Sequence, residues 1–194
     1  MTEIITKLPS TLQIECIQYL KTPNERIILA GFNGVGKTSF IRRCTNREFQ
    51  TNYIPNNTNL PEIVTLNQRA KVVVLSDQWT AGIEQRLLRN TNQLPTRVIL
   101  MASVITSISL RKIYQYYIPL FLELEREMLA NGSRFSIDIV LTNTDHPRYT
   151  WRELELRRLK LKVREFNINP VYYVSNKTGD GFDNKYFDYL RNEF

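Results

Sequence analysis

The sequence predicts an α/β fold: a mainly parallel six-stranded sheet with one antiparallel hairpin strand and helices on both faces. Three observations predict it. Strand-like apolar runs alternate with helical patterns along most of the chain, as parallel βαβ units require. Several of these runs are apolar almost throughout, which is typical of strands that are buried on both faces. Motif-bearing loops directly follow strands, where sheets of this kind place their ligands.

The first half of the chain supplies three of the expected strands. A strand over residues 25–31 leads through a glycine-rich turn into a helix over 37–46. Two further apolar runs, 61–66 and 71–75, are separated by the polar stretch 67–69, which has the length of a hairpin turn. This hairpin supplies the antiparallel strand.

The second half alternates strands and helices more regularly. A polar loop over 76–96, with a short helical pattern at 83–88, leads into a strand over 97–101 that is buried by composition. The elements expected after it are an amphipathic helix over 109–129 ended by Asn131-Gly132, a strand over 135–141, a basic helix over 150–166, a strand over 171–174 and a closing helix over 183–193.

The chain divides into an N-terminal extension, residues 1–24, and one domain over 25–194. Ser10 is an N-cap for an amphipathic helix in the extension, and Pro23 ends that helix. The helix is similar to the first helix of an F-box, a resemblance that covers this one helix. It is therefore either a helix packed on the domain or an adaptor that recruits a partner.

Composition is that of a soluble globular protein, with 42% hydrophobic and 23% charged residues in a chain of 194. The formal net charge of +7 raises the question of a nucleic-acid partner. The basic residues are dispersed, however, and their densest run, Arg152 to Arg164, is interspersed with Glu153 and Glu155. We interpret this run as one solvated helix face and expect no nucleic-acid partner.

Other residue types exclude several classes of protein. His146 is the sole histidine, which argues against a histidine-dependent metal cluster or catalytic triad. Cys16 and Cys44 lack metal-ligand spacing, so we expect two reduced thiols in the cytosol. The sequence has no membrane-spanning run, no signal peptide and no lipidation motif at either end. We expect a cytoplasmic monomer without a lipid anchor.

The segment from Gly31 to Thr38 reads G-x-x-x-x-G-K-T between a strand and a helix, which is the phosphate-binding loop pattern. Its glycines let backbone N–H groups converge on a phosphate at a helix N-terminus. Lys37 would reach the β- and γ-phosphates, and the Thr38 hydroxyl would ligate Mg²⁺. The residues predicted to line the loop are Asn33, Gly34, Val35, Gly36, Lys37, Thr38 and Ser39.

With these elements placed, residues 25–194 resemble a Ras-superfamily small GTPase, with Rho- and Rab-like features. Five segments, of which the phosphate loop is the first, carry the resemblance in the family's order and spacing. It implies a G domain of the P-loop NTPase fold, binding GTP or GDP with Mg²⁺. At Asn33 the family commonly has glycine, and a side chain there hinders hydrolysis.

The second segment, Phe49 to Asn56, is similar to the first switch, F-x-x-x-Y-x-P-T. The resemblance implies that Phe49 packs against the guanine base. Asn56 stands where the family has the threonine that holds Mg²⁺, and its amide oxygen is an acceptable ligand for a hard cation. Thr58, two residues on, is the alternative ligand.

The third segment, Trp79 to Glu84, is similar to the second switch, D-T-A-G-Q-E. The resemblance implies that the Gly82 N–H bonds the γ-phosphate, which makes Gly82 and Lys37 the catalytic candidates. Trp79 replaces the aspartate on the metal side, and Ile83 replaces the glutamine that orients water. In a second register, Asp77 takes the metal-side position.

The fourth and fifth segments address the base. Leu141 to Asp145 resembles N-K-x-D in its T-x-x-D form, and Asp145 would accept from guanine N1–H and the 2-amino group, which adenine lacks. Asn143 replaces the lysine whose stem covers the base. Ser175 to Gly179 is similar to S-A-K-T-G, so the Asn176 N–H would contact guanine O6 and the Lys177 stem would stack on the base.

These residues predict a guanine-nucleotide-binding molecular switch with weak or absent GTP hydrolysis, because Asn33, Trp79 and Ile83 each disfavour that step. The alternative is a non-catalytic pseudo-GTPase that sequesters partners of cellular GTPases. Effectors or regulators would bind through residues 49–60 and 79–90 in either case.

Deletion of residues 1–24 tests the proposed division of the chain. If the N-terminal helix is an appendage or an adaptor, the truncated protein binds GDP with unchanged affinity, because every predicted nucleotide contact lies beyond residue 30. Equilibrium titration with a fluorescent GDP measures the dissociation constant. A loss of more than about tenfold would place the helix within the nucleotide-binding domain.

Overall fold

The computed structural model describes residues 25–45, 49, 62–65, 70–75, 96–130, 134–147, 153–166, 168 and 171–183. The helices expected over 1–24 and 83–88 lie outside the described residues, as does the closing helix beyond residue 183. The N-terminal extension and its boundary therefore remain predictions.

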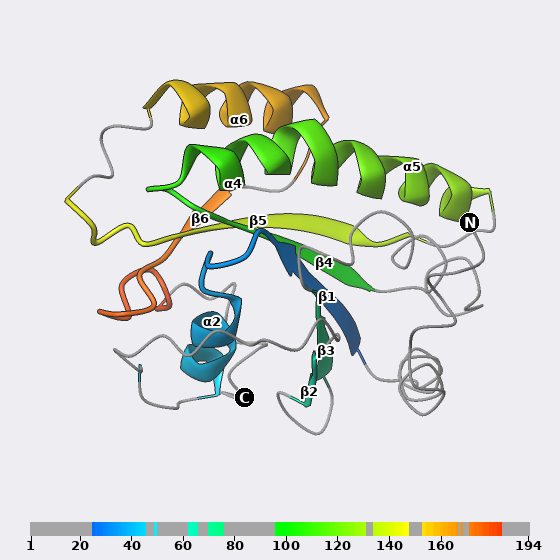
Figure 1. Ribbon diagram of the computed structural model, residues 1–194. Coiled ribbons are helices and arrows are strands. Elements are labelled where there is room, and N and C mark those ends of the chain that lie inside the picture. The colour runs from blue at the N-terminus through cyan, green and yellow to red at the C-terminus, as the bar shows by residue number, and fades with distance from the viewer. Residues whose placement is uncertain are drawn as a thin grey trace, which may run out of the picture.

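A six-stranded sheet forms the centre of the domain (Figure 1). Its strands are β1 (Glu25–Gly31), β2 (Glu62–Thr65), β3 (Ala70–Val74), β4 (Arg97–Ser103), β5 (Ser136–Thr142) and β6 (Val171–Tyr173). Their order is β2-β3-β1-β4-β5-β6, and every neighbouring pair is parallel except β2 and β3. The predicted sheet with its antiparallel hairpin strand is confirmed.

One face of the sheet is covered by α2 (Lys37–Cys44), the helix that follows the phosphate loop (Figure 1). Phe40 of α2 packs there with Ile27 and Leu29 of β1 in a buried core. Cys44 is buried in the same core, whereas Cys16 lies outside the described residues, so the prediction of two reduced thiols stays a prediction.

The other face is covered by two long helical segments (Figure 1). They are α4 (Ser107–Lys112), η3 (Ile113–Tyr117) and α5 (Ile118–Leu129), which run on continuously, and α6 (Glu153–Glu165). Phe121 of α5 and Leu159 of α6 share a second core with Ile28 of β1 and Leu100 of β4. Successive residues of the central strands thus enter opposite cores, so the strands are apolar along their whole length.

The segment between β4 and β5 departs from the single α-helix predicted over 109–129. It begins at Ser107 and contains η3, a π-helical turn, just before Pro119. Proline has no N–H to donate, and its ring crowds the carbonyl four residues back. The chain accommodates Pro119 with a wider turn, in which the Ile118 N–H donates to the Ile113 carbonyl.

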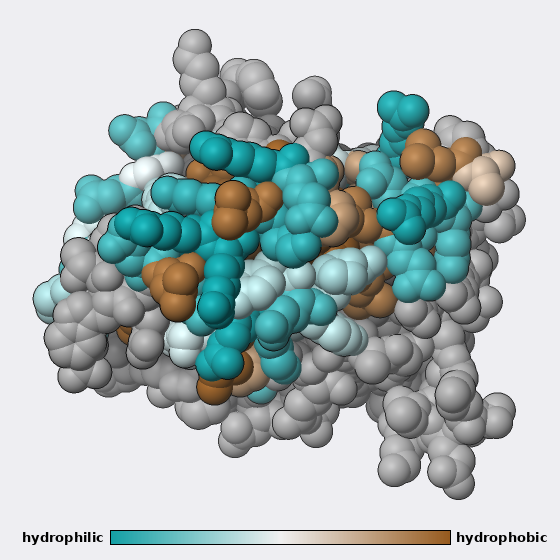
Figure 2. All heavy atoms as spheres, turned by 90° about the horizontal axis from the view of Figure 1, so that it is seen from above, coloured by the Kyte–Doolittle hydropathy of each residue, from teal (hydrophilic) through white to brown (hydrophobic). Residues whose placement is uncertain are grey.

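The outer side of α6 is the solvated basic face that its sequence predicts. Arg157 and Glu153 pair at 2.6 Å while their side chains stay 72% and 68% exposed. Figure 2 shows this side of the molecule as mostly hydrophilic with separate apolar spots. On the inner side, Glu155 Oε2 accepts a hydrogen bond at 2.6 Å from the Tyr114 hydroxyl of η3, which fastens α6 to its neighbour. Among the described helices, none is long and apolar enough to cross a membrane.

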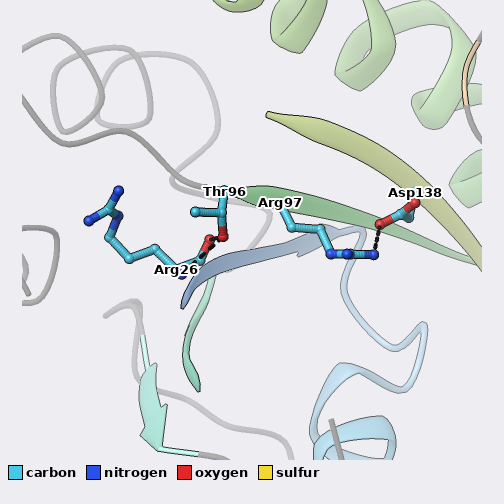
Figure 3. A network of polar contacts seen from close by, with 4 residues as sticks. All are labelled: Arg26, Thr96, Arg97 and Asp138. Atoms are coloured by element: carbon cyan, nitrogen blue, oxygen red, sulfur yellow. Dashed lines mark hydrogen bonds and ion pairs between the residues drawn. The ribbon is translucent and has the colours of Figure 1, made fainter. Parts of the chain in front are cut away.

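An ion pair between a half-buried arginine and a buried aspartate joins β4 and β5 near their amino ends (Figure 3). The Arg97 guanidinium donates to Asp138 Oδ2 at 3.1 Å, and the Asp138 side chain is completely buried. Beside it, the Thr96 hydroxyl both donates to the Arg26 carbonyl and accepts from the Arg26 N–H, at 3.1 Å each. Burial raises the pKa of the Tyr172 phenol; the Asp138 charge adds to this rise and the Arg97 charge opposes it.

Replacing Arg97 by methionine should destabilise the protein by about 3 kcal/mol, because it removes a counter-charge from a buried carboxylate. The matched control is Arg157→Met, which breaks an exposed pair and should cost less than about 0.5 kcal/mol. Urea unfolding followed by circular dichroism gives both values. Equal losses in the two variants would contradict a special role for the pair of Arg97 and Asp138.

Candidate nucleotide-binding site

Loops from neighbouring strands converge at the carboxyl edge of the sheet. The phosphate loop follows β1, and the segments that begin at Asn143 and Val174 follow β5 and β6. β4, which lies between β1 and β5, contributes Ser103. Because α2 and α4 leave this edge toward opposite faces (Figure 1), it has the topology at which open α/β sheets bind ligands.

The backbone of the phosphate loop depends on glycine at two points. Gly36 is the N-cap of α2 and has φ of 92°, a left-handed conformation that L side chains rarely adopt. Gly31 lies so close to the Met101 carbonyl of β4 that a Cβ atom would collide with it. The first glycine of the motif therefore serves packing against the sheet, and the second turns the chain into the helix.

The start of α2 fits a phosphate group. This helix has no side-chain hydrogen bond at its N-cap and no acidic residue in its first turn. The positive end of the helix dipole is thus not neutralised locally. The Lys37 ammonium donates to the carbonyls of Gly31 at 2.7 Å and Phe32 at 3.1 Å, which holds a cation over the same loop. Thr38 is exposed at the beginning of the helix, where it can face a metal ion.

A short buried hydrogen bond ties the phosphate loop to β5. The Thr142 hydroxyl donates to the Val35 carbonyl at 2.6 Å, and both residues are buried. The same hydroxyl also lies 3.3 Å from the Ala102 carbonyl of β4. Thr142, predicted only as the first letter of T-x-x-D, therefore fixes the position of the loop two strands away.

Asp145 and Ser175, which belong to the two predicted base-recognition segments, lie in contact. The Ser175 hydroxyl donates to Asp145 Oδ1 at 2.7 Å and accepts from the Thr178 N–H at 3.0 Å. Ser175 is completely buried, whereas Asp145 is exposed. A buried hydroxyl thus orients an exposed carboxylate, and the contact of Asp145 with a base stays a prediction.

Asn143 and Lys177, from the two predicted base-recognition segments, each form a hydrogen bond within the protein. Asn143 has a φ of 61°, in the left-handed region that asparagine tolerates, and its Nδ2 donates to Ser103 Oγ at 2.7 Å. Lys177 is exposed and offers its carbonyl to Arg43 at 2.8 Å. Phe49, the predicted base-packing residue, is half-buried. Contacts of these three residues with a base remain predictions.

Arg43, Ser103 and the Asn176 side chain bond residues of the candidate site, although the motifs did not identify them. Arg43 donates to the Asn176 carbonyl at 2.8 and 3.2 Å, across 133 positions of sequence. Nothing local marks Arg43, because it lies in the last turn of an ordinary amphipathic helix. Ser103 carries a usable signal, since it is the polar residue that ends an apolar strand.

The residues of the two switch segments that are predicted to act on the γ-phosphate or its metal ion lie outside the described residues. They are Asn56, Thr58, Asp77, Trp79, Gly82 and Ile83. The segments 49–60 and 79–90, which are predicted to bind partner proteins, lie there too, apart from Phe49. Within the described ranges, no group of three or more His, Cys, Asp or Glu side chains is placed to hold a metal ion. Thr38 is the predicted metal ligand that the described part of the chain contains.

A phosphate cradle and an oriented aspartate at one edge of a parallel sheet define a P-loop nucleotide-binding domain. Residues 26–177 match the family described as 50S ribosome-binding GTPase. The matched range covers most of the 194 residues, so the chain belongs to this GTPase family and contains its GTP-binding domain. The family implies GTP or GDP binding, typically with Mg²⁺. The narrower resemblance to Ras-superfamily small GTPases stays a prediction. No curated protein matches the chain.

Replacing Thr142 by valine should weaken both stability and nucleotide binding. The isosteric change leaves the buried Val35 carbonyl without this donor, a loss of about 1–3 kcal/mol in the free energy of unfolding. We expect GDP affinity to fall about tenfold. Arg157→Met is the control, because Arg157 pairs with Glu153 on the exposed outer side of α6. Urea unfolding measures the stability of each variant, and titration with GDP measures its affinity. Equal stabilities and equal affinities in the two variants would contradict the role of Thr142 in holding the phosphate loop.

Proposed function

We propose that this chain is a guanine-nucleotide switch of the small-GTPase type that hydrolyses GTP slowly or not at all. The observation that carries the proposal is the buried connection between the phosphate loop and the strand that leads to Asp145, made by Thr142 and Val35. It supports one continuous site, in which a base recognised at Asp145 belongs to the same nucleotide as the phosphates at Lys37.

The chain's own residues would bind and orient the nucleotide. Lys37 and the N-terminus of α2 supply positive charge for the phosphates. Asp145, held by Ser175, accepts the N1–H and 2-amino hydrogens of guanine, and adenine would leave that carboxylate unpaired. When bound at Thr38, Mg²⁺ neutralises charge on the phosphate oxygens.

Slow hydrolysis is proposed because the groups that position water are altered. Asn33 is exposed in the phosphate loop, where the resembling family commonly has glycine. Ile83 can neither donate nor accept a hydrogen bond, so it cannot orient a water molecule. Trp79 replaces a metal-side carboxylate, unless Asp77 serves that role. Enzymes accelerate phosphoryl transfer almost wholly by positioning the reacting groups and by stabilising charge in the transition state. Changes at these residues therefore lower the rate of hydrolysis directly.

A second candidate function is a non-catalytic module held in one nucleotide state. The contrast between the intact Gly34–Thr38 cradle and the altered hydrolysis residues favours it. Such a protein would present residues 49–60 and 79–90 to the partners of cellular GTPases and sequester them.

Base identity is tested by chromatography of the nucleotide released from the denatured protein, with the variant Asp145→Asn. We expect GDP or GTP from the wild type. An asparagine amide donates where guanine also donates, so the variant should lose GDP affinity at least about 100-fold. The same amide complements the 2-oxo group of xanthine, so affinity for XDP should rise. Released ATP, or unchanged GDP affinity in the variant, would overturn the role of Asp145.

Hydrolysis is tested in single-turnover reactions with radiolabelled GTP. We expect the double variant Asn33→Gly with Ile83→Gln to hydrolyse GTP at least about tenfold faster than the wild type, because it restores room and a water-orienting amide. GTP affinity, measured in parallel, should not change. A wild-type rate equal to that of ordinary small GTPases would reject impaired hydrolysis.

A further inference from the structure

We propose that Asn176 is a positioning residue that couples the base-binding loop to the phosphate loop, so that base and phosphates are bound cooperatively. The inference rests on the proposed function. It assigns the coupling to the Asn176 side chain, whereas the sequence motif assigns a role only to the Asn176 backbone N–H. Asn176 lies in the turn after β6 and is only 3% exposed. Its Nδ2 donates to the Gly36 carbonyl at 3.2 Å, which links the two loops directly.

The contact between Asn176 and Gly36 is close enough to constrain both residues. A Cβ atom added to Gly36 would lie 2.7 Å from Asn176 Nδ2. The asparagine amide therefore occupies the space that glycine leaves open at the N-cap of α2. In the segment S-A-K-T-G that this turn resembles, alanine stands at the matching position, and its side chain has no hydrogen-bond donor. The tie is thus a feature of this chain rather than of the pattern.

The orientation of the Asn176 amide follows from its partner. The Gly36 carbonyl can only accept, so Nδ2 must face it. Asn176 Oδ1 is then left buried with no hydrogen-bond partner within the described part of the chain. A buried acceptor without a donor costs free energy. A donor that arrives with the bound nucleotide would recover this cost, which would couple ligand binding to the position of the amide.

Arg43 fastens the same turn to the far end of α2. Its guanidinium donates to the Asn176 carbonyl at 2.8 and 3.2 Å and to the Lys177 carbonyl at 2.8 Å. The turn after β6 is therefore bonded to both ends of α2. The Asn176 side chain bonds Gly36 at the N-cap, and the backbone carbonyls of the turn bond Arg43 in the last turn of the helix. Because α2 carries the phosphate loop, the loop cannot shift without disturbing the base-binding turn.

The experiment compares ligands that occupy one or both halves of the site. Dissociation constants for GDP, guanosine and pyrophosphate are measured by displacement of a fluorescent GDP from the full chain. With Asn176→Ala, we expect GDP to bind at least about tenfold more weakly, and guanosine and pyrophosphate to change by less than about threefold each. Only a residue that couples the two halves produces this difference.

Controls separate coupling from damage to the fold. Asn176→Asp keeps the volume but turns an acceptor toward the Gly36 carbonyl, so it should weaken GDP binding at least as much. Arg157→Met, on the exposed outer side of α6, should leave all three constants unchanged. Thermal unfolding checks each variant. If Asn176→Ala loses its fold, the isosteric Asn176→Asp decides the question through the same ratio of constants.

Several results would overturn the coupling. If Asn176→Ala weakened the binding of GDP and of guanosine equally, Asn176 would be only a local contact to the base. If it left GDP affinity unchanged, Asn176 would have no role in coupling. Failure of the wild type to bind GDP would instead reject the proposed function. The two failures are therefore distinguishable in one set of titrations.

Discussion

The hydrogen bond from Thr142 to the Val35 carbonyl is the constraint on which the site depends. A phosphate loop is a flexible, glycine-containing turn, and its carbonyls must be satisfied once they are buried. Thr142 satisfies one of them from β5 and thereby places the loop relative to the segment that carries Asp145. Asn176 and Arg43 add a second attachment through the turn after β6. The phosphate and base halves of the site are thus parts of one hydrogen-bonded unit.

The elements that sequence patterns predicted well are those whose signal is local. Strands β1, β4 and β5 are buried on both faces, so continuous apolar runs mark them, and the phosphate loop has its own spacing. The irregular turn before Pro119 was missed because helical periodicity outweighed the missing N–H of a single residue. Arg43 and the Asn176 amide could not be predicted, since their partners are distant in sequence and their geometry exists only after the sheet forms. The switch-segment residues expected to act on the γ-phosphate lie outside the described residues and stay predictions.

Binding and hydrolysis make different demands on this chain. Binding requires a cradle, a cation and an oriented carboxylate, and Gly36, Lys37 and Asp145 lie where these are needed. Hydrolysis also requires a positioned water molecule, and the proposal of slow hydrolysis rests on Asn33 and Ile83, which the sequence predicts to disfavour that step. A protein with this combination would remain in one nucleotide state for a long time, and helper proteins rather than intrinsic chemistry would set its timing.

The ion pair of Arg97 and Asp138 has a consequence for how the strands find their register. An apolar strand can slide past its neighbour by two residues and still present the same faces. In the observed register Arg97 lies opposite Ser136, and Asp138 lies opposite Ile99. A two-residue slip would separate the charges and leave a carboxylate buried without this cation, which is strongly unfavourable. One ion pair thus gives two otherwise uniform strands a single alignment, and with it the positions of Ser103 and Thr142 at the opposite end.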